Sequence, residues 1–151
     1  MEQQELNKIK EAAEEFFGKM TIAVDKIEVI PGSDEAELNI KLQEPQVLIG
    51  QGGQTLFEIQ RLLRIILNKK LQKSFYLNLD INNYKAQKVE YLKDLAKSSA
   101  DQVALTREAK ELLPMQAYER RIIHAELSQR QDVVTESQGT DQDRHIVIKP
   151  K

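Results

Sequence analysis

The glycine-rich run at residues 50–53 constrains the fold of this chain more than any other segment. The run reads Gly50-Gln51-Gly52-Gly53 and lies between an apolar segment, Val47-Leu48-Ile49, and an amphipathic helix predicted for residues 55–69. Glycine lets two backbone segments approach closely and tolerates positive φ. The helix that follows presents unpaired N–H groups and the positive end of its dipole, both of which suit phosphate. Taken alone, the run is more typical of a tight helix–helix turn than of a phosphate-binding loop.

The elements predicted around the glycine run change that balance. Hydrophobic spacing predicts a first helix that ends at Gly18, and alternating apolar residues predict two strands joined by a Pro-Gly turn. After the run, Thr55 is expected to cap a helix, and a third strand follows. The order is helix, strand, strand, short helix, glycine loop, helix, strand. In this order, a GxxG loop is the device with which a KH domain clamps about four nucleotides of a single strand. The predicted helices and strands cover residues 3–17, 22–30, 36–42, 55–69 and 74–81.

The surrounding sequence excludes a P-loop and disfavours a dinucleotide-binding loop. A P-loop needs Gly-Lys followed by Ser or Thr, and a dinucleotide fingerprint needs a βαβ unit. KH loops usually carry Lys or Arg beside their glycines, whereas Gln51 and Gln54 occupy these positions here. We therefore expect weak affinity, with phosphate contacts from backbone N–H groups and from cations of the following helix. These cations are Arg61, Arg64, Lys69 and Lys70.

Residues 83–151 form a second predicted unit, in which an Arg and a His share one helix face. Arg120 and His124 are spaced i and i+4 on a predicted helix that carries Tyr118, Ile122 and Ala125 on one side. A guanidinium and an imidazole side by side can contact phosphate and stack on a base. The bare spacing is nevertheless more typical of a solvated helix with an incidental histidine. The predicted elements are a helix at 84–104, a strand at 108–113, a helix at 116–130, and strands at 133–137 and 145–149.

The sequence around Arg120 and His124 resembles that of a known family. The segments Leu113-Pro114-Met115, Glu119-Arg120-Arg121-Ile122-Ile123-His124, Thr135-Glu136-Ser137 and Arg144-His145-Ile146-Val147-Ile148 are similar to the R-three-H domain, named for its Arg and His three residues apart. Together with Leu48-Ile49-Gly50-Gln51-Gly52-Gly53-Gln54-Thr55-Leu56 and Gln60, they make residues 20–150 resemble the Jag family of bacterial proteins, also called SpoIIIJ-associated proteins. The resemblance implies a type II-like KH fold and binding of single-stranded nucleic acid. It also implies a regulatory role linked to cell elongation, cell shape, division or sporulation. Some members pair with a small single-KH protein, and a homodimer is the alternative.

Composition agrees with a globular protein and limits the chemistry. The chain has 151 residues, 40% of them hydrophobic, with no cysteine and two histidines. Disulfides and thiolate metal sites are therefore excluded, and no metal or other cofactor is predicted. The longest apolar stretch, residues 62–67, is interrupted by Arg64 and is too short to span a bilayer, so we expect a cytoplasmic protein. We predict that the protein is not an enzyme; a nuclease or hydrolase that uses His124, with Ser137 as nucleophile, is a remote alternative.

The net charge of −2 is unusual for a nucleic-acid binder, but the charge is unevenly distributed. Residues 1–44 carry eleven acidic and five basic side chains, whereas residues 45–82 carry two acidic and five basic ones. The basic surplus thus follows the glycine run and permits nucleic-acid binding on one face. The acidic balance and the uncharged loop give weight to the chief alternative, a protein–protein adaptor that uses both modules as docking surfaces.

We therefore predict an α+β protein of two small lobes: a type II-like KH domain at residues 1–82, and an R-three-H domain at residues 83–151 in which a small sheet packs with helices. The predicted function is the binding of single-stranded RNA or single-stranded DNA. Gly50 and Gly53 are expected in a turn with exposed N–H groups, and Arg120 and His124 on an exposed face that Arg144 reaches from the last strand. The predicted nucleic-acid contacts are Gly50, Gln51, Gly52, Gly53, Arg61, Arg64, Arg120, Arg121, His124 and Arg144.

Overall fold

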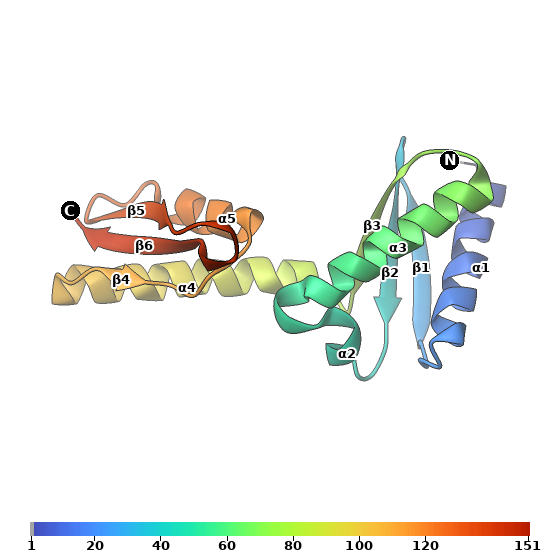
Figure 1. The fold of residues 1–151 in the computed structure, drawn as a ribbon, viewed down its shortest axis with the longest axis horizontal. Coiled ribbons are helices and arrows are strands. Elements are labelled where there is room, and N and C mark those ends of the chain that lie inside the picture. The colour runs from blue at the N-terminus through green and yellow to red at the C-terminus, as the bar shows by residue number, and fades with distance from the viewer. Residues whose placement is uncertain (1) are drawn as a thin grey trace. The chain divides into compact units, whose positions relative to one another are not determined.

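The structure is a computed structural model that describes residues 2–151, and its chain divides into two units (Figure 1). The first unit ends at Lys85, and the second covers Ala86–Lys151. Each unit has its own sheet and its own hydrophobic core. The fold is α+β, with small sheets packed against helices, as the sequence predicts.

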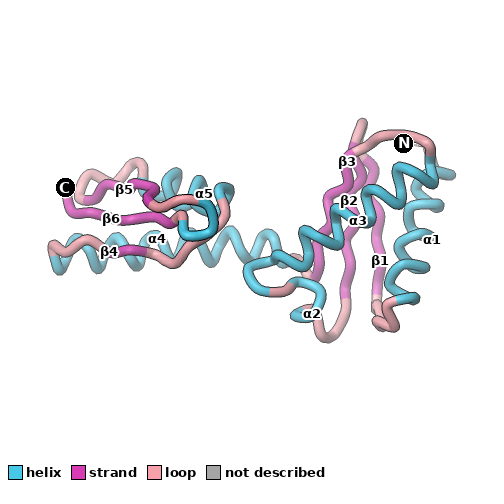
Figure 2. Tube along the Cα trace, in the orientation of Figure 1, coloured by secondary structure: helices cyan, strands magenta, loops and turns pink. Residues whose placement is uncertain are grey.

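The first unit has the element order that the sequence predicts. A three-stranded sheet has the order β1-β2-β3, in which β1 and β2 are antiparallel and β2 and β3 are parallel. Figure 2 shows the helices and strands of this unit along the chain. The elements are α1 (Gln3–Lys19), β1 (Lys26–Pro31), β2 (Glu35–Lys41), α2 (Gln46–Ile49), the 3₁₀ turn η1 (Gln51–Gly53), α3 (Gln54–Leu71) and β3 (Tyr76–Ile81).

The core of the first unit lies between one face of this sheet and the helices α1 and α3. Strand side chains alternate between the two faces, so that Leu38 and Leu79 are buried while Tyr76 is exposed. Apolar residues at helical spacing, Ile9 and Phe17 of α1 and Leu56, Leu63 and Leu67 of α3, cover the buried face. This packing fixes the position of α3, and therefore of the glycine loop at its N-terminus.

The second unit packs two helices with an antiparallel sheet of order β4-β6-β5. Its core joins small and branched residues of α4 and α5 to Ile146 and Ile148 of β6. The elements are α4 (Tyr84–Thr106), which begins two residues before the boundary, β4 (Lys110–Glu111), α5 (Ala117–Leu127), β5 (Val133–Gln138), the 3₁₀ turn η2 (Asp141–Asp143) and β6 (His145–Pro150).

Several details of the sequence prediction are wrong. Gly18 does not end α1, which continues to Lys19 before the chain turns at Thr21 with φ of 57°. Thr55 does not cap α3, because the N-cap position is Gly53 and no side chain bonds there. On α5, Ile123 and Leu127 are buried in the core and Ile122 packs partly buried against it, whereas Ala125 is exposed.

No helix among the described residues 2–151 combines the length and apolar character needed to cross a bilayer.

Candidate nucleic-acid interface

Gly50 makes the sharp exit from α2 that the loop requires. Its N–H donates to the carbonyl oxygen of Gln46 at 2.9 Å, and its φ and ψ of 71° and −177° are essentially restricted to glycine. A Cβ at this position would lie 2.1 Å from Oγ1 of Thr55. Gly50 is therefore required by both conformation and space, and its N–H is used within the fold.

Gly53 closes the loop against the start of α4. It has φ of 84°, is buried, and donates its N–H to the carbonyl oxygen of Gly50 at 3.3 Å. A Cβ here would lie 2.8 Å from Cε1 of Tyr84. The expectation that the N–H groups of Gly50 and Gly53 are exposed is thus incorrect, because both bond to carbonyl groups of the chain. The exposed members of the run are Gln51 and Gly52.

A polar strip on α3 runs along the free edge of β3. The edge N–H of Leu79 donates to Oε1 of Gln60 at 2.9 Å, and the N–H of Phe75 donates to Oδ1 of Asn68 at 3.3 Å. The N–H of Leu79 would otherwise lack a sheet partner, because within residues 2–151 β3 pairs only with β2, and Phe75 lies one residue before β3. Side-chain amides of α3 therefore fix the distance between the helix and the strand edge.

Arg64 lies between these two amides on α3 and borders a hollow of about 500 Å³. The guanidinium side chain is half-buried, whereas Arg61 is exposed and lies outside the residues that line the hollow. Of the other helical cations, Lys70 is bonded to Glu15 at 2.8 Å, whereas Lys69 is exposed. The hollow is lined by Asp34, Arg64, Asn68, Ser74, Phe75 and Tyr76.

In the second unit, Met115 links the two arginines predicted to act together. Nη1 of Arg120 donates to the carbonyl oxygen of Met115 at 2.7 Å, and the N–H of Met115 donates to the carbonyl oxygen of Arg144 at 3.2 Å. The guanidinium of Arg144 turns instead to the carbonyl oxygen of Gly139, at 2.8 Å. Arg121 is exposed on α5. The structure therefore brings Arg120 and the backbone of Arg144 together.

His124 is half-buried against β5, whereas the sequence predicted an exposed helix face for it. Its Nδ1 lies 2.6 Å from Oγ1 of Thr135, and its Nε2 lies 2.9 Å from Oγ of Ser137. Burial lowers the pKa of His124 below its ordinary value, and the charge of Arg120 lowers it further. The imidazole is thus held as a neutral ring beside a permanent cation. Sequence reasoning did not assign these bonds, although the alternation of Thr135 and Ser137 places both hydroxyls on one face of β5.

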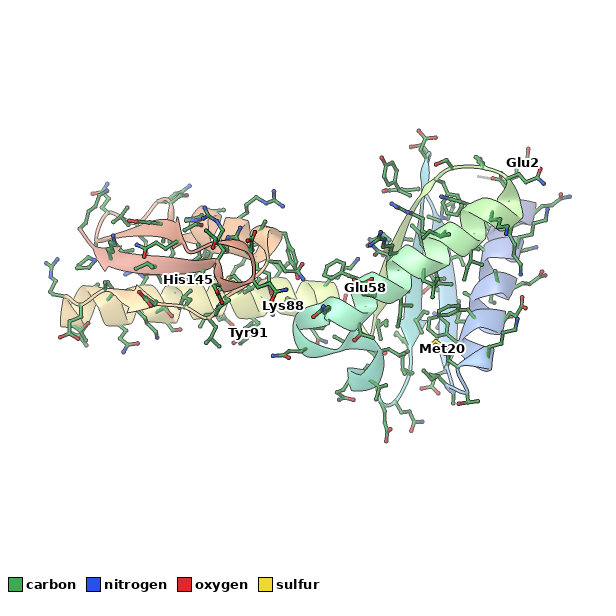
Figure 3. All side chains as sticks on the ribbon, in the orientation of Figure 1. Glu2, Met20, Glu58, Lys88, Tyr91 and His145 are labelled. Atoms are coloured by element: carbon green, nitrogen blue, oxygen red, sulfur yellow. The ribbon has the colours of Figure 1, made fainter. Side chains whose placement is uncertain are left out.

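A buried ion pair holds the N-terminus of α5 on α4. Nζ of Lys88 lies 3.0 Å from Oε1 of Glu119, with side-chain exposures of 18% and 6%. The other carboxylate oxygen of Glu119 accepts the N–H of Gln116 at 2.7 Å, as part of a capping box. Figure 3 labels Lys88 together with Tyr91, whose ring centroid lies 5.5 Å from Nζ of Lys88. This pair fixes the helix turn that presents Arg120, and sequence reasoning did not identify it.

Within residues 2–151, no group of three or more His, Cys, Asp or Glu side chains is arranged to hold a metal ion.

The half-buried Arg and His on α5, with the sheet beneath them, define an R-three-H domain, and the family model of that domain matches residues 90–150. Three curated relatives extend the similarity into the first unit. Each of them is named RNA-binding protein KhpB. The relative from Clostridium symbiosum is 38% identical over 146 residues, which cover 96% of this chain and 66% of that protein. The relative from Bacillus subtilis is 33% identical over 92% of this chain and 65% of its own length. The relative from Streptococcus pneumoniae is 27% identical over 93% of this chain and 44% of its own length.

The chain belongs to the Jag family of bacterial proteins, as the sequence motifs predict. It spans just under two thirds of the length of the relatives from Clostridium symbiosum and Bacillus subtilis.

Proposed function

We propose that this chain binds single-stranded RNA through two modules, a KH domain at residues 1–82 and the R-three-H domain. The observation that carries the proposal is the presence in one chain of a GxxG loop between two helices and an R-three-H domain. The relatives named RNA-binding protein KhpB, which align over more than nine tenths of this chain, support it.

The chemistry of the two sites suits a sugar–phosphate backbone. At the loop, exposed Gln51 and Gly52 precede the N-terminus of α3, where N–H groups and the helix dipole favour an anion. Farther along α3, Arg64 would contact the RNA backbone, and exposed Arg61 and Lys69 would contact it from the solvent side of the helix. On α5, exposed Arg121 and half-buried Arg120 would hold phosphate, and His124 would pack beside a base or a sugar.

The family also motivates a cellular role. In this proposal the protein is a cytoplasmic regulator acting after transcription, linked to cell elongation, division or sporulation, and it assembles with a small single-KH protein or with itself. Single-stranded DNA is a competitor for the same sites, because the contacts named above are to phosphate groups. The proposed role is binding rather than catalysis.

A salt titration with a labelled single-stranded RNA tests the proposal. For single strands, the logarithm of the association constant falls with the logarithm of salt concentration with a slope of about −0.7 per phosphate contact. A steep negative slope supports phosphate contacts. If no RNA binding is detected at low salt concentration, the proposed function is wrong.

Arg120 and Arg121 form a matched pair for the second module. Arg121→Ala should weaken binding to all RNA sequences and make the salt slope shallower by about one contact, with little change in stability. Arg120→Ala should weaken binding and also lower the free energy of unfolding by about 1–3 kcal/mol, because the bond to Met115 is lost. Lys8→Ala, on the acidic helix α1, is the control. Loss of stability without loss of RNA affinity in Arg120→Ala, with Arg121→Ala unchanged, would exclude this helix from the interface.

One observation favours a docking role as the second candidate. Leu62 and Ile65 are 48% and 55% exposed on the solvent side of α3, where burial against another protein would be favourable. RNA binding without a salt slope, or no RNA binding together with a concentration-dependent increase in mass, would favour this adaptor function.

A further inference from the structure

Lys85, the second residue of α4, places an ammonium group between α3 and β3. Its Nζ donates to Oε1 of Gln60 at 3.1 Å and to Oδ1 of Asn78, and it lies 5.7 Å from the ring centroid of Phe57. Gln60 and Phe57 come from the first two turns of α3, directly after the glycine loop. A residue beyond the predicted boundary of the KH domain thus places a cation between β3 and the first turns of α3, whereas the glycine loop itself carries no cation.

The ammonium group of Lys85 is neutralised only in part. Its two hydrogen-bond acceptors are amide oxygens, whereas the nearby carboxylate of Asp80 accepts the backbone N–H groups of Ile81 and Lys85 at 2.9 and 3.2 Å. Burial lowers the pKa of Lys85, and the charges of Asp80 and Glu37 offset this only partly. A half-buried cation of this kind gains from a further acceptor supplied by a ligand.

Hydrogen-bond donors predominate at this position. An ammonium group has three donors, two of which are used by Gln60 and Asn78. The side-chain oxygens of Gln60 and Asn78 both accept from Lys85, and that of Gln60 also accepts from Leu79. The NH₂ groups of Gln60 and Asn78 can therefore donate to a ligand. The ring of Phe57 supplies an apolar wall next to these donors.

We propose that Lys85, Gln60 and Asn78 form a base-recognition site that selects a nucleobase with two adjacent acceptors. Guanine presents O6 and N7 in this way, and cytosine presents O2 and N3. Adenine presents its N6 donor next to an acceptor on both edges, beside N1 on one and beside N7 on the other. A donor-rich site therefore disfavours adenine. The site rests on the proposed RNA-binding function: the loop would hold the backbone, and Lys85 would read one base beside it.

The test compares short single-stranded RNAs that differ in one base. A series of oligoadenylates, each with one central adenine replaced by guanine, cytosine or uracil, is titrated against the full chain at fixed salt concentration. The chain should bind the guanine or the cytosine RNA about tenfold more tightly than oligoadenylate. The separate guanine and cytosine arms identify which base the site takes.

Lys85→Met should reduce this ratio of affinities to about one, and Lys85→Gln should reduce it similarly. The ratio is internal to each protein sample, so partial unfolding of a variant lowers both affinities and leaves the ratio unchanged. Lys8→Met, an exposed lysine of α1, is the control and should keep the ratio. If the unaltered chain binds all four RNAs equally, or if Lys85→Met keeps the preference, the base-recognition site is wrong while RNA binding stands. No binding to any RNA would instead remove the proposed function itself.

Discussion

Gly52 and Gly53 are neighbours in the chain, but a side chain would meet different surroundings at each. A Cβ at Gly52 meets nothing within 4 Å, whereas a Cβ at Gly53 would lie 2.8 Å from the ring of Tyr84. Both have positive φ, which costs a non-glycine residue about 1 kcal/mol, less for Asp and Asn. A double replacement of Gly52 and Gly53 would therefore disturb the fold.

Single replacements of Gly52 and Gly53 should have different effects on stability and on RNA binding. Gly52→Asp should weaken RNA binding at least several-fold, because the carboxylate repels phosphate, while the free energy of unfolding falls by about 1 kcal/mol. Gly53→Asp should cost clearly more stability, because Tyr84 must move. Urea denaturation and RNA titration of each variant check this. Equal stability of the two variants would contradict the Tyr84 contact, and unchanged affinity of Gly52→Asp would exclude the loop from the interface.

His124 makes the stability of the second unit depend on pH. Its pKa in the folded protein is lowered, mainly by burial and then by Arg120, so the unfolded chain binds the proton more readily. The stabilisation is fully present above the ordinary pKa of about 6.5 and is lost as the pH falls through the lower pKa of the folded state. The advantage of the unaltered chain over His124→Gln in free energy of unfolding should therefore be constant from about pH 7 to 8. It should shrink toward about pH 5, and an advantage that grows on acidification would contradict the burial of a neutral ring.

At the scale of elements, hydrophobic periodicity predicted the helices and strands, while tertiary contacts set their ends. Asn82 illustrates the limit. Its side chain bonds to both the N–H and the carbonyl oxygen of Leu42, at 3.0 and 2.7 Å. At the start of α4, the N–H of Lys85 donates to Oδ1 of Asp80. A partner 40 residues away cannot be predicted from local spacing, and the same holds for the position of Tyr84 beside Gly53 and for the bond of Lys85 to Gln60.

The candidate sites show the same division between local and distant information. The GxxG pattern and the Arg-x-x-x-His spacing are local, so the sequence could place Gly50 and Arg120 on the correct elements. Other partners within the sites come from distant elements: Thr135 of β5 bonds His124, and Gln60 of α3 accepts the N–H of Leu79 in β3. Sequence spacing therefore predicted where the groups lie, but it did not predict which N–H groups and ring nitrogens were already bonded.

The ion pair between α4 and α5 gives a prediction at this scale. Lys88→Met leaves the carboxylate of Glu119 buried with a single bond to the backbone and should lower the free energy of unfolding by about 3 kcal/mol. Lys97→Met is the matched control, since its pair with Glu126 has exposures of 59% and 22% and should contribute less than about 1 kcal/mol. Urea denaturation monitored by circular dichroism measures both. Equal losses for the two variants would mean that the burial of Lys88 and Glu119 contributes nothing.

For the whole molecule, the uneven charge of the sequence is explained by where the charges lie. The acidic helix α1 bonds two basic residues that follow the glycine loop, through Glu15 to Lys70 at 2.8 Å and Glu5 to Lys73 at 3.2 Å. Part of the basic surplus counted in residues 45–82 is therefore neutralised within the first unit. The cations left for a ligand are fewer than the sequence suggests, which agrees with the expectation of weak affinity for the first module alone.

Two weak sites in one chain should act together on a long RNA. Once one site has bound, the second meets the same strand at a high effective concentration, so affinity should rise steeply when the RNA becomes long enough to occupy both. We expect little gain among RNAs of about four to six nucleotides and a gain of at least tenfold at some greater length. Titrations with an unstructured RNA series of increasing length measure this. Gly52→Asp and Arg121→Ala should each abolish the step while leaving the remaining site able to bind short RNA. A smooth rise in affinity that merely follows the number of overlapping sites would show that a single module binds the RNA.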